Sequence, residues 1–557
     1  MHHDPRNEPA RSLRGINAEN IVYPHLSWGD AMRVRETSSA HAPWMTYIAP
    51  SGRQTFDRTT FTYADFIVSA RKLATLLANN GVARGSRVAI ADHNHPDTIL
   101  AYFACWLLGA CAVPLNMSED DARLTYILND SNACCILCRS EYIGRVSGLA
   151  PSATNIVDVD TDSATSAHQA HVAQLAPHAY PEADDDMRFE ECLVVYTSGT
   201  TGNPKGVVLI QQNLFADGYD IASWHGIDES TRMMCVLPVH HVNGTIVTHV
   251  APFLAGASVV LNRKFSASHF FDIVRAEGVH IVSVVPTLLA FLLEANANGQ
   301  GAVEGGFRHI ICGAGPLTCD LASRFEEHYG IPIVHGYGLS ETTCYTCFLP
   351  RTLSWTEHQR WMQEFGYPSI GVPLGCNEMA IHTPEGIAVT DGERGEIVSR
   401  GPNVMKEYYG NPSATHEAFL HGWFRTGDEG FAMRDENGNK YFFITGRIKE
   451  LIIRGGVNLA PLEIDEVIAR APGVRAGIAV GFDNDVYGEE VGALVIPRDT
   501  ESSADAILAY CREHLPFHKA PKVVLFTDVL PVTSTGKYQR NKVKSLFAEF
   551  QSVQYRA

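Results

Sequence analysis

A loop rich in glycine and hydroxyl residues is the first segment whose composition indicates chemistry. It reads TSGTTGNPKG over residues 197–206, and apolar stretches typical of β-strands flank it at 193–196 and 207–210. Such a loop offers backbone N–H groups and short hydroxyl donors to an anion, and Lys205 adds a positive charge. The segment is therefore expected to bind phosphate. It is not a Walker loop, because Pro204 stands where that pattern requires its second glycine.

Seven segments of the chain resemble, in order, the signatures of the adenylate-forming (ANL) superfamily. This superfamily includes the acyl-CoA synthetases of the AMP-dependent synthetase and ligase family, the adenylation domains of peptide synthetases, and luciferases. The segments are YTSGTTGNPKGV, PVHHVNG (238–244), GAGPLT (313–318), GYGLSET (336–342), GWFRTGD (422–428), GRIKELIIRGGVN (446–458) and STGKYQR (534–540). The resemblance implies an enzyme that uses ATP and Mg²⁺ to convert a carboxylic acid into an acyl-adenylate. It would then transfer the acyl group to coenzyme A.

The resemblance also implies roles for four catalytic side chains. A carboxylate that attacks the α-phosphorus of ATP approaches another anion, so the site needs cations and aligned donors around the developing charge. Glu341 would hold the Mg²⁺ ion, because a bare carboxylate near phosphates would raise the barrier. Lys205 belongs to the phosphate loop, and Lys537 would bridge the carboxylate and the α-phosphate during adenylation. His241 would line the acyl tunnel.

A larger set of residues is expected to bind ATP and coenzyme A. By resemblance, Tyr337 stacks on adenine and Ser340 hydrogen-bonds the α-phosphate. Asp428 and Arg447 bind the ribose hydroxyls. Lys449 occupies the hinge about which the family's small domain rotates between its two half-reactions. The full predicted set is Thr197, Ser198, Gly199, Thr200, Thr201, Gly202, Gly313, Ala314, Gly315, Gly336, Tyr337, Ser340, Thr342, Asp428, Arg447, Lys449, Gly455 and Gly456. The last two glycines would let the pantetheine arm of coenzyme A approach the backbone closely.

The segments that wall the acyl pocket by resemblance carry almost no charge. They are residues 236–245, 283–293, 310–318 and 334–349, which contain no Lys, Arg or Asp and a single Glu, Glu341. A second carboxylate or an ammonium group on the substrate would be desolvated there without a partner, which is costly. The substrate is therefore expected to be a monocarboxylic acid with an uncharged tail, aromatic or medium-chain. The sequence does not separate those two.

Other acids and other acceptors stay open at this stage. A free-standing amino-acid adenylation domain usually holds the substrate ammonium with an Asp in the segment that here reads PVHHVNG, and that segment contains no acid. A carrier-protein thiol, an amine or another small nucleophile could replace coenzyme A as the acceptor. A homodimer is also compatible with the sequence. A non-catalytic binding protein is disfavoured, because Lys205, Glu341 and Lys537 are all present.

Composition argues against several other classes of protein. With 44 Lys and Arg against 62 Asp and Glu the net charge is -18, so neither nucleic acid nor an anionic membrane surface is an expected partner. Thirteen cysteines without a secretory leader are typical of a reduced, cytoplasmic enzyme.

Two local segments bear on contacts with a membrane and with phosphate. Residues 99–115 are apolar, but Gly109 and Pro114 interrupt them, which predicts a buried helix and strand instead of a membrane span. Six Lys or Arg within 517–544, against one Asp, are expected to form a basic patch for nucleotide phosphates, with a solvated charged face as the alternative for Arg540, Lys542 and Lys544.

These segments require a scaffold of strands and helices to bring them together. From Phe61 onward, short apolar strands alternate with amphipathic helices, beginning with a helix that Thr62 and Asp65 cap and Gly81 ends. The polar residues 152–186 are interpreted as a surface linker. The pattern predicts an α/β protein with a flexible arm (1–20), a large N-terminal adenylation domain of layered β-sheets and helices (21–448), and a small mobile C-terminal α+β domain (449–557).

Overall fold

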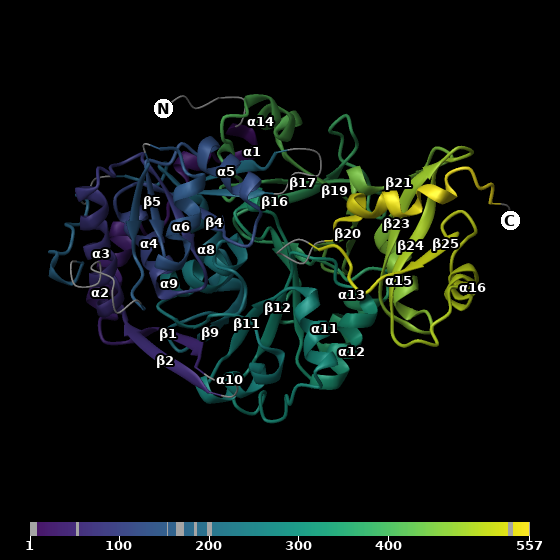
Figure 1. The fold of residues 1–557 in the computed structure, drawn as a ribbon, viewed down its shortest axis with the longest axis horizontal. Helices are drawn as coiled ribbons and strands as arrows, with labels where there is room; N and C mark the ends of the chain where they lie inside the picture. Colours follow the sequence, from purple (N-terminus) through teal and green to yellow (C-terminus); the bar gives the residue numbers. More distant parts are fainter. Residues whose placement is uncertain are drawn as a thin grey trace.

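The described residues form four β-sheets (Figure 1). Three belong to a large N-terminal part, and the fourth belongs to a smaller C-terminal part. The computed structural model describes residues 8–51, 55–152, 154–162, 172–182, 186–197, 203–532 and 538–555. Within these ranges no helix is long and apolar enough to span a membrane. The α-helices are α1 (Glu8–Arg11), α2 (Trp28–Ser38), α3 (Tyr63–Asn79), α4 (Pro96–Leu107), α5 (Asp121–Asp130), α6 (Ser140–Leu149), α8 (Gln211–His225), α9 (Ala251–Ala255), α10 (Phe270–Glu277), α11 (Pro286–Glu294), α12 (Cys319–Tyr329), α13 (Trp355–Gln363), α14 (Pro412–Ala418), α15 (Pro461–Arg470) and α16 (Ala504–His514).

A seven-stranded sheet carries the two ends of the glycine-rich phosphate loop. Its strand order is β18-β8-β7-β4-β3-β5-β6. The strands are β3 (Arg87–Asp92), β4 (Cys111–Asn116), β5 (Cys135–Cys138), β6 (Asn155–Asp158), β7 (Glu191–Thr197), β8 (Lys205–Ile210) and β18 (Glu407–Tyr408). β7 and β8 are antiparallel, and Thr197 pairs with Lys205 at their open end. The loop therefore leaves and re-enters the sheet at adjacent positions.

A nine-stranded sheet presents the GAGPLT and GYGLSET segments. Its order is β15-β14-β13-β12-β11-β9-β10-β1-β2. The strands are β1 (Pro43–Pro50), β2 (Phe56–Thr62), β9 (Arg232–Cys235), β10 (Ser258–Asn262), β11 (Ile281–Val284), β12 (His309–Cys312), β13 (Ile333–Tyr337), β14 (Cys347–Phe348) and β15 (Val372–Pro373). In the sheet order, every pair of neighbouring strands from β13 to β1 is parallel. GAGPLT and GYGLSET therefore meet at the carboxyl edge of neighbouring strands, where open α/β sheets bind ligands.

Helices fill the space between these two sheets. α3, α4 and α8 share one hydrophobic core with residues of both sheets. Every residue of α4 is buried, as expected for a helix that is apolar on all sides, and the stretch 99–115 forms α4 and β4 as predicted. α3 begins with the predicted capping box, because Thr62 Oγ1 accepts a hydrogen bond from the Asp65 N–H and the Asp65 carboxylate accepts one from the Thr62 N–H.

A four-stranded antiparallel sheet leads into the C-terminal unit. It has the order β16-β17-β19-β20. Its strands are β16 (Glu378–His382), β17 (Gly395–Arg400), β19 (Phe424–Arg434) and β20 (Lys440–Arg447). β20 continues through the short 3₁₀ turn η6 (Ile448–Glu450) into the last sheet.

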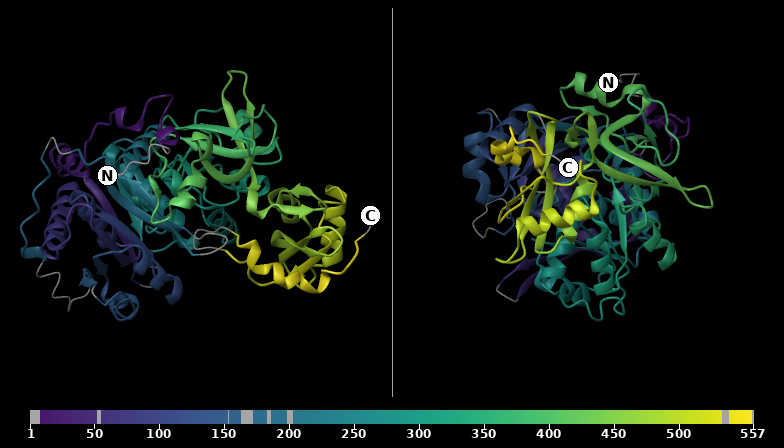
Figure 2. Two further views of the ribbon diagram at one scale, coloured as in Figure 1. Left: turned by 90° about the horizontal axis from the view of Figure 1, so that it is seen from above. Right: turned by 90° about the vertical axis from the view of Figure 1, so that its right-hand side faces the viewer.

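The C-terminal unit has its own sheet and its own core. The strand order is β22-β21-β24-β23, with β25 paired to β24. Its strands are β21 (Ile452–Arg454), β22 (Val457–Leu459), β23 (Val474–Asn484), β24 (Gly488–Pro497) and β25 (Val523–Phe526). α15 and α16 pack on it through residues such as Ile464 and Ile507. Figure 2 shows this unit projecting from one side of the large part. The domain limits 21–448 and 449–557 stay a prediction.

Two polar stretches are more ordered than their composition indicates. Residues 8–20, expected to belong to a flexible arm, include α1, whose Ala10 and Arg11 are buried. Ala10 C=O accepts a hydrogen bond from the Gly401 N–H (3.0 Å). Within the expected linker 152–186, β6 adds a parallel strand to β5. In both cases tertiary contacts satisfy backbone groups of a segment that has no apolar periodicity.

Four of the five described Lys and Arg residues in the basic segment near the C-terminus form ion pairs, contrary to the expected phosphate-binding patch. Lys519 pairs with Glu463 (2.6 Å) and Lys544 with Glu489 (2.5 Å). The other described pairs are Lys522 with Glu490, and Arg540 with Asp465 and Glu450. The acids stand on α15, β24 and η6, outside the 517–544 window. Charge counted along one segment therefore overestimates the local positive potential.

The C-terminal unit docks on the large part through α15. Glu466 Oε1 accepts a hydrogen bond from the backbone N–H of Cys319 at the start of α12 (2.6 Å), and Arg475 on β23 pairs with Glu294 on α11 (2.5 Å). A helix N-terminus carries N–H donors without intrahelical partners, so a carboxylate is a suitable acceptor there. Burial nevertheless raises the pKa of Glu466 to about 7. Docking therefore favours the protonated carboxyl.

Glu466→Gln should remove a pH dependence from the stability of the docked chain. The folded pKa is about 7 and the ordinary value is 4.5. Between these values the folded state holds an extra proton, so the wild-type protein loses stability as pH rises through that window. Gln accepts the same N–H bond without a charge. Its advantage in unfolding free energy should therefore grow from near zero at the lower pH to at most about 3 kcal/mol above pH ~7. Urea unfolding of both proteins at the two ends of the window measures this, and parallel pH profiles would refute the assignment.

Candidate active site

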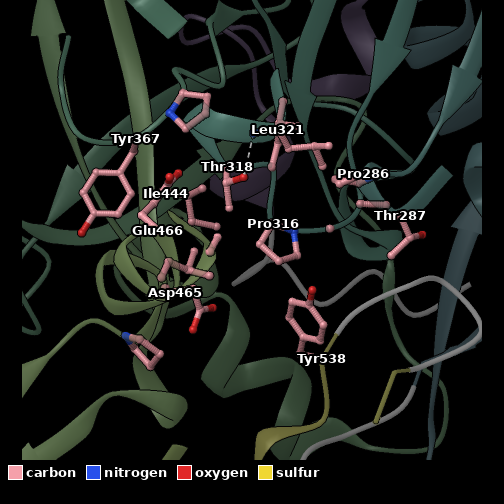
Figure 3. Close-up of a pocket in the computed structure, with 18 of the residues that line it drawn as sticks. Pro286, Thr287, Pro316, Thr318, Leu321, Tyr367, Ile444, Asp465, Glu466 and Tyr538 are labelled. Atoms are coloured by element: carbon pink, nitrogen blue, oxygen red, sulfur yellow. Dashed lines mark hydrogen bonds between the residues drawn. The ribbon is translucent and has the colours of Figure 1, made fainter. Parts of the chain in front are cut away.

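A cavity of about 290 Å³ lies where the two parts of the chain meet (Figure 3). The large part lines it with the GAGPLT and GYGLSET segments and with the facing ends of β19 and β20. The C-terminal unit contributes Asp465 and Glu466 of α15 together with Tyr538, which Figure 3 shows below Pro316. Five of the seven predicted segments thus contribute residues to one space, whereas the described residues of the phosphate loop and of PVHHVNG contribute none.

Two predicted glycines pack the nucleotide loops against each other. A methyl group on Gly313 would lie 2.8 Å from the carbonyl oxygen of Gly336, and one on Gly336 would lie 2.3 Å from the ring of Phe348. Neither position has room for a side chain. Ala314 adopts a left-handed conformation (φ 63°) and, with Gly315, lines the cavity. Gly313 therefore supports the loop from behind, while Ala314 and Gly315 face the space predicted for adenine.

A buried carboxylate joins the nine-stranded sheet to the four-stranded sheet. Asp428 on β19 is 1% exposed and accepts a hydrogen bond from the hydroxyl of Tyr337 on β13. Asp428 Oδ1 also lies 2.8 Å from Nε of Arg447, its cross-strand partner on β20. Burial and the charge of Asp428 raise the pKa of Tyr337, so the hydroxyl keeps its proton and donates. All three residues line the cavity, which places the predicted adenine and ribose residues together.

Lys205 and Glu341 are linked through an aromatic residue that sequence reasoning missed. Lys205 Nζ lies 4.7 Å from the centroid of the Tyr408 ring, and the Tyr408 hydroxyl donates to Glu341 Oε1 (2.8 Å). Tyr408 reaches this position because β18 pairs with β8, which begins at Lys205. No motif marks Tyr408, and about two hundred residues separate it from Lys205. The predicted phosphate-binding cation and the predicted metal ligand therefore share one neighbour.

Glu341 suits a magnesium ion that a nucleotide brings with it. Mg²⁺ keeps several waters and takes few protein ligands when it is bound to phosphates, so one half-buried carboxylate is sufficient. Over the described part of the chain, no group of three or more His, Cys, Asp or Glu side chains could hold a metal ion alone. The donor set thus fits a metal–nucleotide complex and not an all-protein metal site.

The segment after β13 folds back on itself and holds Glu341 in place. It turns at η4 (Ser340–Thr342). Thr342 is buried, and its hydroxyl accepts a hydrogen bond from the Leu339 N–H (3.0 Å). Its side chain therefore supports the turn, and Thr342 is not among the residues that line the cavity. Its role in cofactor binding stays a prediction. Gly338 lies under the turn, where an added methyl group would fall 1.8 Å from the carbonyl oxygen of Cys344.

Ten of the predicted residues that the structure describes do not line this cavity: Lys205, Glu341, Thr197, Gly313, Ser340, Thr342 and the four that follow. His241 is half-buried and contacts the ring of His240, with 4.5 Å between the ring centroids. Lys449 is exposed at the centre of η6. Gly455 and Gly456 form the exposed two-residue turn between β21 and β22, and both have positive φ (58° and 82°). A tight hairpin with positive φ at both central positions favours glycine, which gives the pair a structural reason independent of coenzyme A.

Part of the predicted site lies outside the described residues, namely Ser198, Gly199, Thr200, Thr201, Gly202 and Lys537. Thr197, at the end of β7, places its hydroxyl 3.5 Å from the carbonyl oxygen of Lys205.

Arg540, just after Lys537 in the sequence, is buried. Its Nη1 lies 3.0 Å from Asp465 Oδ1 and 2.7 Å from the Ala479 carbonyl oxygen. This pair, also missed from sequence, anchors the end of the STGKYQR segment to α15 and β23.

Comparison with known proteins defines the family. Residues 38–409 match the AMP-binding enzyme family, and residues 463–537 match the AMP-binding enzyme C-terminal domain. The sulfoacetate–CoA ligase of Cupriavidus necator is 34% identical over 490 residues, which cover 86% of this chain and 92% of the relative. The feruloyl-CoA synthase of Amycolatopsis sp. is 33% identical and covers 88% and 94%. The chain therefore belongs to the AMP-binding enzymes of the ANL superfamily and, within them, to the ATP-dependent, AMP-forming acid–CoA ligases.

Solved structures have the same architecture. The o-succinylbenzoate coenzyme A synthetase (MenE) from Bacillus subtilis, in complex with ATP and a magnesium ion, matches with a TM-score of 0.78 and 28% identity over 92% of this chain and 99% of that one. ATP-bound MatB from Rhodopseudomonas palustris shares the fold with a TM-score of 0.84 at 24% identity, over 95% and 100%. The predicted α/β fold, with a large N-terminal domain and a small C-terminal domain, is confirmed. Rotation of the small domain stays a prediction.

Gly338→Ala should lower the rate of adenylation by about 10²-fold while the protein stays folded. The methyl group would lie 1.8 Å from the Cys344 carbonyl oxygen, so the turn that carries Glu341 must move. A misplacement of about 1 Å at a catalytic group costs on the order of 10²-fold in rate. Acid-dependent pyrophosphate release measures the effect.

The matched control for this change is Gly144→Ala on α6, where an added methyl group meets nothing within 4 Å. Ala is the better helix former by roughly 1 kcal/mol, so this variant should be as active as the wild type and at least as stable. Equal activity of the Gly338 and Gly144 variants would show that the turn does not position the catalytic carboxylate.

Proposed function

We propose that this acid–CoA ligase acts on a monocarboxylic acid with an uncharged tail, aromatic or medium-chain. ATP with Mg²⁺ converts the acid into an acyl-adenylate and pyrophosphate, and coenzyme A then takes the acyl group as AMP leaves. The observation that carries the proposal is the absence of Lys, Arg and Asp from the segments 236–245, 283–293, 310–318 and 334–349. A charged tail would enter these walls without a partner.

The packing of these walls supports an apolar substrate. Val236, Leu237, Val284 and Leu289 are buried and belong to one hydrophobic cluster of the large part. Apolar pockets with a few oriented polar groups are typical of small-molecule sites. The relatives named above, a sulfoacetate–CoA ligase and a feruloyl-CoA synthase, differ in their acid. The acid is therefore inferred from the walls of this chain.

The nucleotide would be held by two groups of residues during the first half-reaction, of which only the first lines the cavity. Tyr337, Asp428 and Arg447 would bind adenine and ribose, because they share one hydrogen-bonded cluster at the cavity wall. Lys205 and Glu341, linked through Tyr408, would bind the phosphates and Mg²⁺. The metal supplies positive charge that offsets repulsion between the substrate carboxylate and ATP. Lys537 would add a cation at the reacting α-phosphate.

The second half-reaction would use the other face of the C-terminal unit. Tyr538, next to Lys537 in sequence, lines the cavity, whereas the Gly455–Gly456 turn is exposed and does not. η6, with Lys449 at its centre, is the short connection between β20 and β21. Rotation about this turn would exchange the Lys537 segment for the glycine turn, beside which coenzyme A could pass. Lys449, Gly455 and Gly456 are thus assigned to the thioester step and not to ATP.

The test is acid-dependent pyrophosphate release across a panel of acids, with and without coenzyme A. The panel contains benzoate, cinnamate, hexanoate to dodecanoate, malonate and free amino acids. We expect kcat/KM for the best uncharged-tail acid to exceed that for malonate by about tenfold or more, because an unpaired buried carboxylate is costly. A preference for malonate or an amino acid would contradict the proposed acid. Pyrophosphate release without any thioester product would contradict coenzyme A as the acceptor.

Lys537→Ala is the control that separates the two half-reactions. Removing a charge partner of the transition state should lower pyrophosphate release by roughly 10²- to 10³-fold. The same variant should still convert synthetic acyl-adenylate and coenzyme A into the thioester. Near-normal pyrophosphate release would show that Lys537 does not serve adenylation.

A further inference from the structure

Tyr345 lies where the four segments assigned to the acyl pocket converge. Its side chain is 2% exposed, its hydroxyl accepts a hydrogen bond from Asn243 Nδ2 (3.1 Å), and Ser283 Oγ donates to Asn243 Oδ1 (2.7 Å). On its other side the ring lies against glycine backbone. Methyl groups on Gly313 and Gly336 would fall 2.5 Å from Tyr345 Oη and 2.9 Å from its Cε1. The Tyr345 side chain thus contacts three of the four segments directly. It is linked to the fourth, at Ser283, through Asn243.

The backbone N–H and the backbone carbonyl of Tyr345 both have side-chain hydrogen-bond partners. Its N–H donates to Asp217 Oδ2 (3.2 Å), and its carbonyl oxygen accepts a hydrogen bond from Asn403 Nδ2 (3.2 Å). Asp217 is fully buried, and burial raises the pKa of its carboxyl well above the ordinary value. The ring also packs against Phe348, with 4.3 Å between the centroids. Because its backbone, its ring and its hydroxyl all have packing or hydrogen-bond partners, the Tyr345 side chain is held in one orientation.

The nucleotide cavity stops before it reaches the loop that carries His241. Among the described residues, its lining comes from segments such as 286–290, 314–318 and 335–339, and none comes from 236–245. The space between the 236–245 loop and the glycines at 313 and 336 is the space that the Tyr345 ring occupies. An acyl group that extended from the glycines toward this loop would therefore meet the Tyr345 ring.

We propose that Tyr345 determines specificity by setting the depth of the acyl pocket, so that this ligase accepts compact acids, short-chain or single-ring, and rejects long alkyl tails. The proposal rests on the proposed function and narrows it, because it removes the longer medium-chain acids. An alkyl tail that reached the position of the ring would have to displace a side chain held at three points. Overpacking of this kind is destabilising even when a single methylene group is added.

The test is equilibrium binding of non-hydrolysable adenylate analogues, N-acylsulfamoyl adenosines with butanoyl, benzoyl, octanoyl or decanoyl tails, to the full-length protein. The wild-type protein should bind the octanoyl analogue about tenfold or more weaker than the butanoyl analogue. Tyr345→Ala should bind the octanoyl analogue about tenfold or more tighter than the wild type does, because the volume of the ring becomes available to the tail. Tyr345→Phe keeps that volume, so it is the matched control and should retain the wild-type order.

Tyr345→Leu provides a second variant of intermediate volume, and ATP binding reports whether the glycine loops of each variant are intact. The same order of tail lengths in the wild-type, Ala and Leu proteins would overturn the proposal. So would a wild-type protein that prefers octanoyl to butanoyl, or loss of ATP binding by both variants, which would make Tyr345 a packing residue of the nucleotide loops. The measurement needs neither coenzyme A nor turnover, so a failure of the proposed function appears separately, in the acid panel.

Discussion

The carboxylate of Asp428 fixes three elements of the site to one point. It is almost fully buried, it accepts the hydroxyl hydrogen of Tyr337 from the nine-stranded sheet, and it pairs with Arg447 at the end of β20. A buried carboxylate without partners would cost several kcal/mol, so the two sheets can approach only when both partners are in place. Because Arg447 directly precedes η6, the same interaction fixes the point from which the C-terminal unit departs. Nucleotide site and domain connection thus share one constraint.

A second feature of the site is that backbone packs against backbone. The GAGPLT and GYGLSET segments follow adjacent parallel strands, and Gly313, Gly336 and Gly338 have no room for a methyl group. This close packing leaves the acyl side of the loops for one large side chain, Tyr345, and the other side for the nucleotide. Both ligands would therefore contact the same glycine loops, and the substrate carboxylate must reach past them to the α-phosphorus that it attacks.

Local signals in the sequence identify many of the elements, and the family segments bring part of the predicted site together. The Thr62–Asp65 capping box, the buried helix within 99–115 and the strands on both sides of the phosphate loop all occur as predicted. These features depend on neighbouring residues only. The family segments likewise place Tyr337, Asp428 and Arg447 at one cavity.

What sequence could not show depends on long-range pairing. Tyr408 links Lys205 to Glu341 only because a two-residue strand pairs with β8. The sequence predicts a basic patch within 517–544, but acids from outside that segment, such as Glu463 and Asp465 on α15, pair with four of its described Lys and Arg residues. The burial of Ala10 follows from tertiary contacts in the same way, because its carbonyl oxygen accepts a hydrogen bond from the distant Gly401 N–H.

Calorimetric titration of ATP with Mg²⁺ into Asp428→Asn tests the central constraint most directly. Asn keeps the shape of the side chain but removes the charge that pairs with Arg447, so the Kd for ATP should rise by about ten- to a hundredfold in a folded protein. Asp391→Asn is the control, because Asp391 pairs with Arg434 near the far end of β19 and does not line the cavity, and its Kd should equal that of the wild type. An unchanged Kd in Asp428→Asn would contradict the role given to this carboxylate in the nucleotide site.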